Sequence, residues 1–153
     1  MAVGKSTLGP PLAAALGLPF VDLDAAIEAS AGRRIATIFA EEGEAAFRAL
    51  EAAAVGQLCL GPPVVVALGG GTLHQPDLLA RLRARFDVVV LHVEWPVVEA
   101  RLRAGADRPL AARGKALFQA RAAGYRSAGR LVDITGLHPD AAVAAVLQRL
   151  ESP

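Results

Sequence analysis

Four short apolar runs alternate with helical patterns along this chain of 153 residues, and that alternation restricts the possible folds more than any other feature. The runs lie at residues 18–23, 64–68, 88–92 and 131–134. The run 64–68, Val-Val-Val-Ala-Leu, has no polar residue, which is typical of a strand covered on both faces in a parallel sheet. Strands alternating with helices predict an α/β fold, with a parallel sheet and helices on both of its faces.

The helical patterns have recognisable ends. A glycine, Gly17, ends the first helix, and Gly32 ends the second, which we expect Asp24 to cap at its start. Gly43 separates the third pattern from a longer one, and Pro139 opens the last. The helices are expected at 6–16, 24–31, 35–43, 44–58, 77–84, 95–103, 117–127 and 139–150.

The first helix opens directly on Gly4-Lys5-Ser6-Thr7, the second half of the phosphate-binding motif G-x-x-x-x-G-K-[ST]. In that motif, backbone N–H groups and the lysine bind nucleotide phosphates, and the hydroxyl reaches Mg²⁺. The first glycine of the motif would precede Met1 by two residues, and the strand that feeds the loop would precede that glycine. We therefore expect a three-layer α/β/α sheet of P-loop kinase type that lacks its first, central strand. Either the protein starts upstream, which we favour, or the chain is truncated and catalytically weak or inactive.

Composition narrows the class of protein. The 16 basic and 15 acidic residues give a net charge of +1, so no basic field indicates binding to nucleic acid or to an anionic membrane. No apolar run reaches the ~20 residues of a membrane span, and the single cysteine excludes a disulfide within the chain. We expect one cytoplasmic, monomeric domain over residues 1–153, with no nucleic-acid or membrane partner.

Two acids, Asp22 and Asp24, stand at the end of the apolar run 18–23, where the carboxyl edge of a parallel sheet places ligands. One acid could hold a metal through water, and the other could accept the proton of a substrate hydroxyl. The alternative is one helix-capping aspartate and one solvated aspartate.

Arg48 follows Phe47, and Glu51 lies three residues further on. An Arg–Glu pair at this spacing is commonly a surface ion pair of little consequence. Alternatively, Arg48 faces a pocket beside the phenyl ring and binds a substrate carboxylate through its forked guanidinium.

Three consecutive glycines, 69–71, follow the buried run 64–68. They forgo the stability of helix and strand, so either a ligand approaches the backbone closely or the chain makes a plain turn. Further on, seven basic residues crowd residues 101–126, either as a solvated face or as part of a site. Among them Arg108 lies in the polar segment 104–116, where a phosphoryl-transfer enzyme would carry a lid arginine.

These motifs, in this order, resemble bacterial shikimate kinases over the whole chain. The resemblance rests on segments 4–7, 18–28, 38–51 and 68–72, on Arg108-Pro109-Leu110, and on Arg121 followed by Tyr125. It implies transfer of the ATP γ-phosphoryl group to the 3-hydroxyl of shikimate in aromatic amino-acid biosynthesis, with ATP and Mg²⁺ bound.

The resemblance also implies roles for particular residues, with a substrate-binding region at about 23–51 and a lid at about 104–116. Catalysis would fall to Lys5, Asp24 as candidate base, and Arg108. The remaining implied sites are the nucleotide site, with Gly4, Lys5, Ser6, Thr7, Arg101 and Arg108; the metal site, with Ser6 and Asp22; and the shikimate site, with Asp24, Phe39, Phe47, Arg48, Gly69, Gly70, Gly71 and Arg121.

The chain departs from the family pattern at Ala2, in a short lid, and at Ala123-Gly124. Two other functions therefore stay open. One is a related small-molecule kinase such as a gluconate kinase, and the other is a non-catalytic module that binds shikimate.

Overall fold

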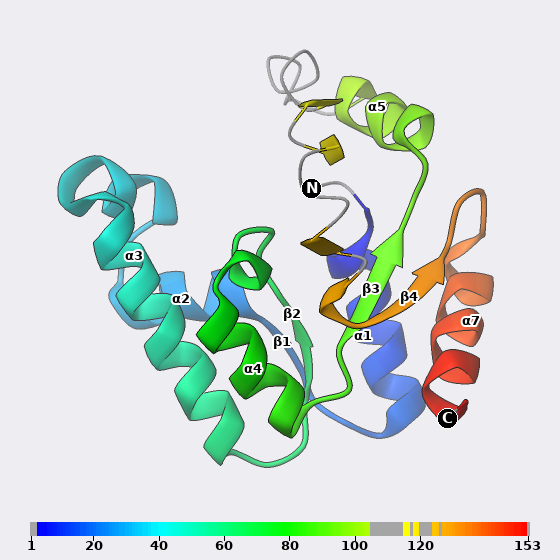
Figure 1. The fold of residues 1–153 in the computed structure, drawn as a ribbon, viewed down its shortest axis with the longest axis horizontal. Helices are drawn as coiled ribbons and strands as arrows, with labels where there is room; N and C mark the ends of the chain where they lie inside the picture. Colours follow the sequence, from blue (N-terminus) through cyan, green and yellow to red (C-terminus); the bar gives the residue numbers. More distant parts are fainter. Residues whose placement is uncertain (1–2, 105–114, 117, 120–123, 126, 153) are drawn as a thin grey trace. The chain divides into compact units, whose positions relative to one another are not determined.

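The computed structural model describes residues 3–104, 115–116, 118–119, 124–125 and 127–152, in which the strands are short and most of the chain is helical (Figure 1). The chain groups into two compact units. We call Ala13–Arg85 the central unit, and Met1–Leu12 with Phe86–Pro153 the terminal unit. The sequence-based expectation of a single domain stays a prediction.

The central unit contains one parallel pair of strands, in which Phe20 pairs with Val65 and Asp22 with Ala67. Each strand leads into helical structure, and α2 packs against β1. Its elements are the end of α1 (Lys5–Leu16), β1 (Phe20–Asp22), α2 (Leu23–Ala31), α3 (Ile35–Leu60), β2 (Val65–Ala67), the short 3₁₀ helix η1 (Thr72–His74) and α4 (Pro76–Arg85).

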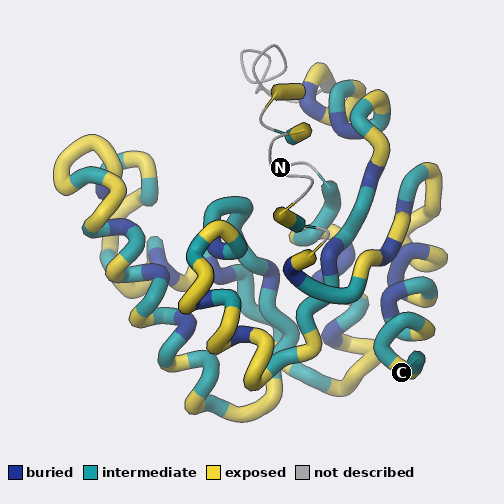
Figure 2. Tube along the Cα trace, viewed as in Figure 1, coloured by how far each residue is buried: buried dark blue, intermediate teal, exposed yellow. Residues whose placement is uncertain are grey.

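Buried residues recur about once per turn along α4 and along α3 from Phe47 to Val55, and the two helices pack beside each other (Figure 2). On α4, Leu78 and Leu82 are four residues apart, and the exposed fraction of each is 4% or less. This spacing puts one stripe of a helix toward the core. The other buried apolar side chains of this unit are Ala13, Leu23, Ile27, Ile38, Phe47, Val55 and Ala67.

The terminal unit is built on a second parallel pair, in which Val89 pairs with Arg130 and His92 with Asp133. Leu8 of α1 is buried in the same cluster as the apolar side chains of the strands and of the helices beside them. The other elements are β3 (Val89–His92), α5 (Trp95–Ala104), β4 (Arg130–Asp133) and α7 (Pro139–Glu151), and the cluster includes Val93, Val98, Leu102, Val132, Ile134, Val143 and Val146.

Each apolar run named above forms a strand, and both strand pairs are parallel, as predicted. Within the described residues the strands form two separate two-stranded sheets. The break expected at Gly43 is present inside α3, where φ is 81° and ψ is 178°. A residue with a Cβ rarely adopts this backbone conformation, which explains why a glycine stands between two stretches of good helix formers.

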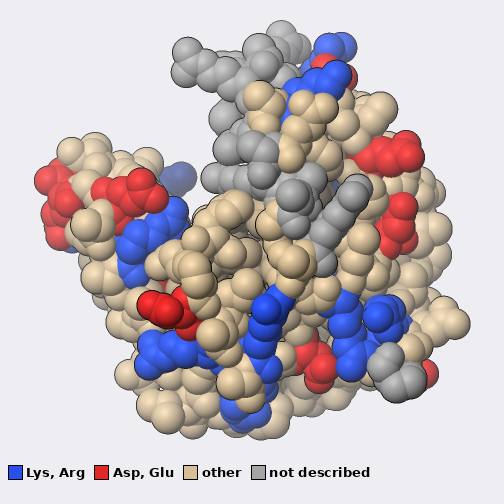
Figure 3. Space-filling model, viewed as in Figure 1, with Lys and Arg blue, Asp and Glu red and all other residues tan. Residues whose placement is uncertain are grey.

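Acidic and basic side chains are interspersed on the face drawn in Figure 3, and acidic ones gather over the first turns of α3, where Glu41, Glu42 and Glu44 lie. This distribution agrees with the near-neutral net charge of +1. Among the described helices, none combines the length and the apolar composition needed to cross a membrane.

Gly129, which directly precedes β4, tests how closely the chain there packs against the backbone of Val88. A Cβ added there would lie 2.2 Å from the carbonyl oxygen of Val88, and the neighbouring amide of Arg130 donates to that oxygen at 2.8 Å. We expect Gly129→Ala to lower the free energy of unfolding by ~2–4 kcal/mol, measured by urea denaturation, because backbone must move.

The matched control is Gly56→Ala in α3, where a Cβ meets no atom within 4 Å. That change should leave stability equal or higher by ~0.5–1 kcal/mol, because alanine favours helix over glycine. Equal effects of the two substitutions would contradict the close approach at Gly129.

Candidate functional site

The loop after β2 brings together two of the predicted substrate residues and the bare backbone of two glycines. A Cβ on Gly69 would lie 2.8 Å from Oδ1 of Asp24, and a Cβ on Gly71 would lie 2.7 Å from Nη2 of Arg48. The glycines at 69 and 71 therefore leave room for a carboxylate and a guanidinium. The interpretation of the triple glycine as a plain turn is insufficient, because the chain's own functional groups approach it closely.

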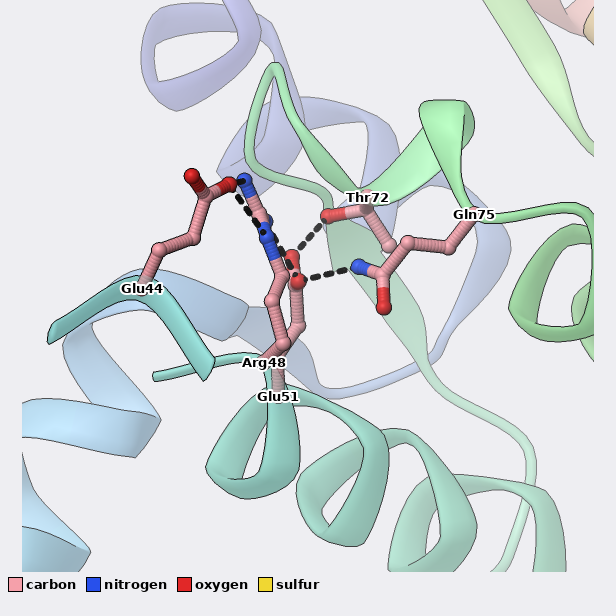
Figure 4. A network of polar contacts seen from close by, with 5 residues as sticks. All are labelled: Glu44, Arg48, Glu51, Thr72 and Gln75. Carbon is pink, nitrogen blue, oxygen red and sulfur yellow. Dashed lines mark hydrogen bonds and ion pairs between the residues drawn. The ribbon is translucent and has the colours of Figure 1, made fainter. Parts of the chain in front are cut away.

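Arg48, on α3, is held by two acids of the same helix (Figure 4). Its Nη1 donates to Oε2 of Glu51 at 2.7 Å, and its Nη2 and Nε donate to Oε1 of Glu44 at 2.9 Å and 3.2 Å. Glu44 stands four residues before the arginine and Glu51 three residues after it, so both lie on its side of the helix. The guanidinium is thereby fixed at two of its edges.

Arg48 keeps its charge in this setting. Partial burial acts to lower the pKa of Arg48, but the hydrogen bonds that it donates to Glu51 and Glu44, and the negative charges of these acids, outweigh burial, so the pKa is raised above its ordinary value. The side chain is 28% exposed. A fixed, charged and accessible guanidinium can bind a carboxylate or phosphate of a ligand.

Glu51 is buried, so the interpretation of the Arg48–Glu51 pair as a surface ion pair is wrong. Its side chain is 1% exposed, and besides Arg48 it accepts hydrogen bonds from Thr72 Oγ1 at 2.5 Å and from Gln75 Nε2 at 2.6 Å. Thr72 entered the sequence-based expectations only as the last residue of segment 68–72, and Gln75 did not enter them. For the burial of Glu51 the available signal was spacing, because Phe47, Glu51 and Val55 are four residues apart and all three are buried.

The two predicted aromatic residues lie against each other. The ring centroids of Phe39 and Phe47 are 4.9 Å apart, and Cζ of Arg48 lies 5.2 Å from the centroid of the Phe47 ring. Phe47 is 5% exposed, whereas Phe39 is 39% exposed. Phe47 therefore supports the guanidinium from the core, and Phe39 offers an apolar surface to a ligand.

Asp22, at the end of β1, and Asp24, in α2, have different surroundings, and the predicted cap is corrected. Asp22, not Asp24, caps α2, since its Oδ1 accepts from the backbone N–H of Asp24 at 3.1 Å and of Ala25 at 3.3 Å. Asp22 has the extended backbone that a capping residue needs, whereas Asp24 already lies in the first helical turn. Asp24 is the acid that faces the glycine loop.

In the terminal unit, the predicted phosphate-binding residues lie at the start of α1. Gly4 has a φ of 104°, and its carbonyl accepts from the backbone N–H of Thr7 at 3.1 Å and of Leu8 at 2.9 Å. Lys5 is the first residue of the helix, followed by Ser6. A helix N-terminus carries partial positive charge and suits an anion, so this segment has the form of a phosphate site.

Arg101 of α5 lies beside the same loop, because a Cβ on Gly4 would be 3.8 Å from its Nη1. Arg108 and Arg121 lie outside the described residues, as does most of the predicted lid at 104–116. In the part of the chain that the structure describes, no group of three or more His, Cys, Asp or Glu side chains could hold a metal.

The family model for shikimate kinase matches residues 1–151. Among curated relatives, the shikimate kinase of Paramagnetospirillum magneticum is 38% identical over 156 aligned positions, covering 98% of this chain and 80% of the relative. The shikimate kinase of Bradyrhizobium diazoefficiens is 46% identical over 110 residues, covering 72% of this chain. This chain spans about half the length of that second relative (53%).

Two solved structures are also similar. Shikimate kinase from Bacteroides thetaiotaomicron is 28% identical with a TM-score of 0.88, and covers 99% of this chain and 94% of its own. Shikimate kinase from Acinetobacter baumannii, solved in complex with shikimate, is 30% identical with a TM-score of 0.85, and covers 98% and 88%.

Removal of Glu51 should be costly because three donors would lose their acceptor. We expect Glu51→Ala to lower the free energy of unfolding by ~3 kcal/mol, measured by urea denaturation. Glu42→Ala, also on α3, is the control: its side chain is 45% exposed in an ion pair with Arg33, and its loss should cost less than ~1 kcal/mol. Similar losses for both would show that burial of Glu51 adds nothing.

Proposed function

We propose that this chain, which belongs to the shikimate kinase family, transfers the γ-phosphoryl group of ATP to the 3-hydroxyl of shikimate. The observation that carries the proposal is Arg48, a charged guanidinium with fixed position, a partly exposed surface and an aromatic wall beside it. Shikimate is a small carboxylate with several hydroxyl groups, so it requires a cation at one end and hydrogen-bonding groups at the other. Arg48 and Asp24 would supply both.

The carboxylate of shikimate would bind Arg48, with Phe39 and Phe47 packing against the apolar face of its ring. Arg121 would be the second cation for the carboxylate. The backbone amides of Gly69, Gly70 and Gly71 would line this pocket, since the loop passes beside both Asp24 and Arg48. Arg48 orients the substrate and takes no part in proton transfer.

Asp24 would accept hydrogen bonds from the substrate hydroxyls and take the proton of the reacting 3-hydroxyl as it attacks phosphorus. Its position in the first turn of α2, against Gly69, holds the carboxylate at the loop. A base must lie within hydrogen-bond reach of the proton that it removes. Phosphoryl transfer otherwise depends on positioning and on neutralising charge.

The nucleotide would bind the start of α1, with the N–H groups of Gly4, Lys5, Ser6 and Thr7 on its phosphates. The ammonium of Lys5 would contact the β- and γ-phosphates, Arg101 would lie near adenine, and Arg108 of the lid would neutralise charge on the transferred group. These assignments agree with the helix N-terminus at Lys5 and with Arg101 beside Gly4.

Mg²⁺ would be held by the hydroxyl of Ser6 and, through water, by the carboxylate of Asp22. Hydroxyl and carboxylate oxygens are the hard ligands that this ion prefers, and Asp22 uses Oδ1 for its helix cap. When bound, the ion neutralises negative charge on the β- and γ-phosphates.

The proposal also covers the type of fold and the state of the enzyme in the cell. The fold would be of the three-layer α/β/α P-loop kinase type. The enzyme would be cytoplasmic and monomeric.

The substrate can be tested directly. ADP release, coupled to oxidation of NADH, should depend on shikimate and not on gluconate when each acid is supplied with ATP and Mg²⁺. Turnover of gluconate alone would refute the proposal in favour of a related kinase. Shikimate binding without any ATP binding, measured by calorimetry, would favour a non-catalytic module.

Arg48→Ala should raise the KM for shikimate by about 30-fold, which corresponds to ~2 kcal/mol, because a charge-assisted contact with the carboxylate is lost. The KM for ATP should change by less than about twofold, since the arginine would not touch the nucleotide. Arg33→Ala is the control, because Arg33 is an arginine of the same unit that pairs with Glu41 and Glu42. Equal changes in both KM values for Arg48→Ala would refute the role.

Lys5→Ala should abolish phosphoryl transfer and leave the calorimetric affinity for shikimate within about twofold of the unaltered chain, because the lysine would contact only phosphates. Retention of about a tenth or more of the kcat would contradict the assignment of Lys5 to the γ-phosphate.

A further inference from the structure

Glu51 is the least exposed charged group described in the central unit, and its two carboxylate oxygens divide their hydrogen bonds unequally. Oε1 accepts from Thr72 Oγ1, while Oε2 accepts from both Gln75 Nε2 and Arg48 Nη1 (Figure 4). Thr72 is fully buried, and Glu51 is 1% exposed. A buried carboxylate requires such donors because it has lost its water.

The two acids that contact Arg48 differ in how firmly they are held. Glu44 is 67% exposed, so water competes for its carboxylate and the pair with Arg48 is weak. Glu51 is enclosed, and both of its oxygens are bound from the side opposite α3 by the segment that follows β2. The location of the Arg48 guanidinium therefore depends mainly on Glu51.

Thr72 and Gln75 are themselves fixed by the backbone. Thr72 opens η1 directly after the glycine loop, and its N–H donates to the carbonyl of Gly69 at 3.3 Å. The N–H of Gln75 donates to the carbonyl of Thr72 at 3.3 Å, and the carbonyl of Gln75 accepts from Leu79 of α4 at 2.9 Å. Because these hydrogen bonds hold the backbones of Thr72 and Gln75, the two side chains set the orientation of the Glu51 carboxylate.

We propose that Thr72 and Gln75 are positioning residues for substrate binding, which act through Glu51 to hold Arg48 where it receives the substrate carboxylate. The inference rests on the proposed function and adds two residues to it. With them, the carboxylate of Glu51 ties the glycine loop and the arginine into one unit, and Gly71 allows the close approach of the guanidinium. Substrate affinity therefore depends on side chains that never touch the substrate.

A different account gives the same network a purely structural role, in which it only joins α3 to the segment after β2. The two accounts differ in what a loss would change. A structural link would lower stability and affect both substrates alike. A positioning link would weaken shikimate binding specifically, and only when Arg48 is present to be displaced.

The experiment is a double-mutant cycle in the full chain, with affinity for shikimate measured by calorimetry and both KM values by the coupled assay. Gln75→Leu is the main variant, since Gln75 is only half-buried. We expect it to raise the Kd and KM for shikimate by about fivefold, and to leave kcat and the KM for ATP within about twofold. In an Arg48→Ala background the same substitution should change shikimate affinity by less than about twofold.

Two further variants guard against a failure to fold. Thr72→Ser keeps the hydroxyl and should behave as the unaltered chain, whereas Thr72→Val keeps the shape and should reproduce the effect of Gln75→Leu. Gln57→Leu, at an exposed position on α3, is the matched control and should change neither KM. Melting temperatures of all variants separate loss of fold from loss of affinity.

The outcomes distinguish a failure of the positioning role from a failure of the proposed kinase function. An unchanged or lowered KM for shikimate in Gln75→Leu, an equal rise in the KM for ATP, or an effect undiminished in Arg48→Ala would overturn the positioning role while leaving the kinase assignment intact. If the unaltered chain neither binds nor phosphorylates shikimate, the proposed function fails, and this inference fails with it.

Discussion

The central unit depends on a carboxylate that has been taken out of water. Glu51 is 1% exposed, and three donors from two separate segments of the chain replace its hydration. Burial of an unpaired carboxylate costs several kcal/mol, so these donors have to be present before α3 can pack as it does. The same requirement fixes Arg48, because a guanidinium is one of the three. The contacts that satisfy the buried carboxylate in the core therefore also hold Arg48.

The glycine loop follows from this arrangement. Because Arg48 is held against Gly71 and Asp24 lies against Gly69, a side chain at either glycine would occupy space that these groups already fill. Glycine lowers stability because it loses more conformational freedom on folding than other residues. In this loop that cost is offset by the approach of two charged groups to one short segment. In the terminal unit, Gly4 with its positive φ leads into the N-terminus of α1, an arrangement that suits an anion.

Much of the fold could be predicted because the relevant signals are local. Short apolar runs located β1–β4, and Gly43 marked the break in α3, since both signals depend on a few adjacent residues. The cap of α2 was assigned to Asp24 instead of Asp22, because the two acids differ by only two positions and the choice depends on which backbone is extended. Motifs also singled out Arg48, Asp24 and Gly71, which the structure brings to one loop and which stay predicted substrate residues. Glu51 was underestimated, and Thr72 and Gln75 were missed, because their contacts join residues more than twenty positions apart.

In the proposed function, the fixed guanidinium of Arg48 selects a substrate that carries a carboxylate. The most direct measurement is calorimetric titration of the full chain with shikimate and with the methyl ester of shikimate, which keeps every hydroxyl but carries no charge. The account predicts that the ester binds at least about 30-fold more weakly, because it forfeits the charge-assisted contact. Equal affinity for the acid and the ester would contradict the account.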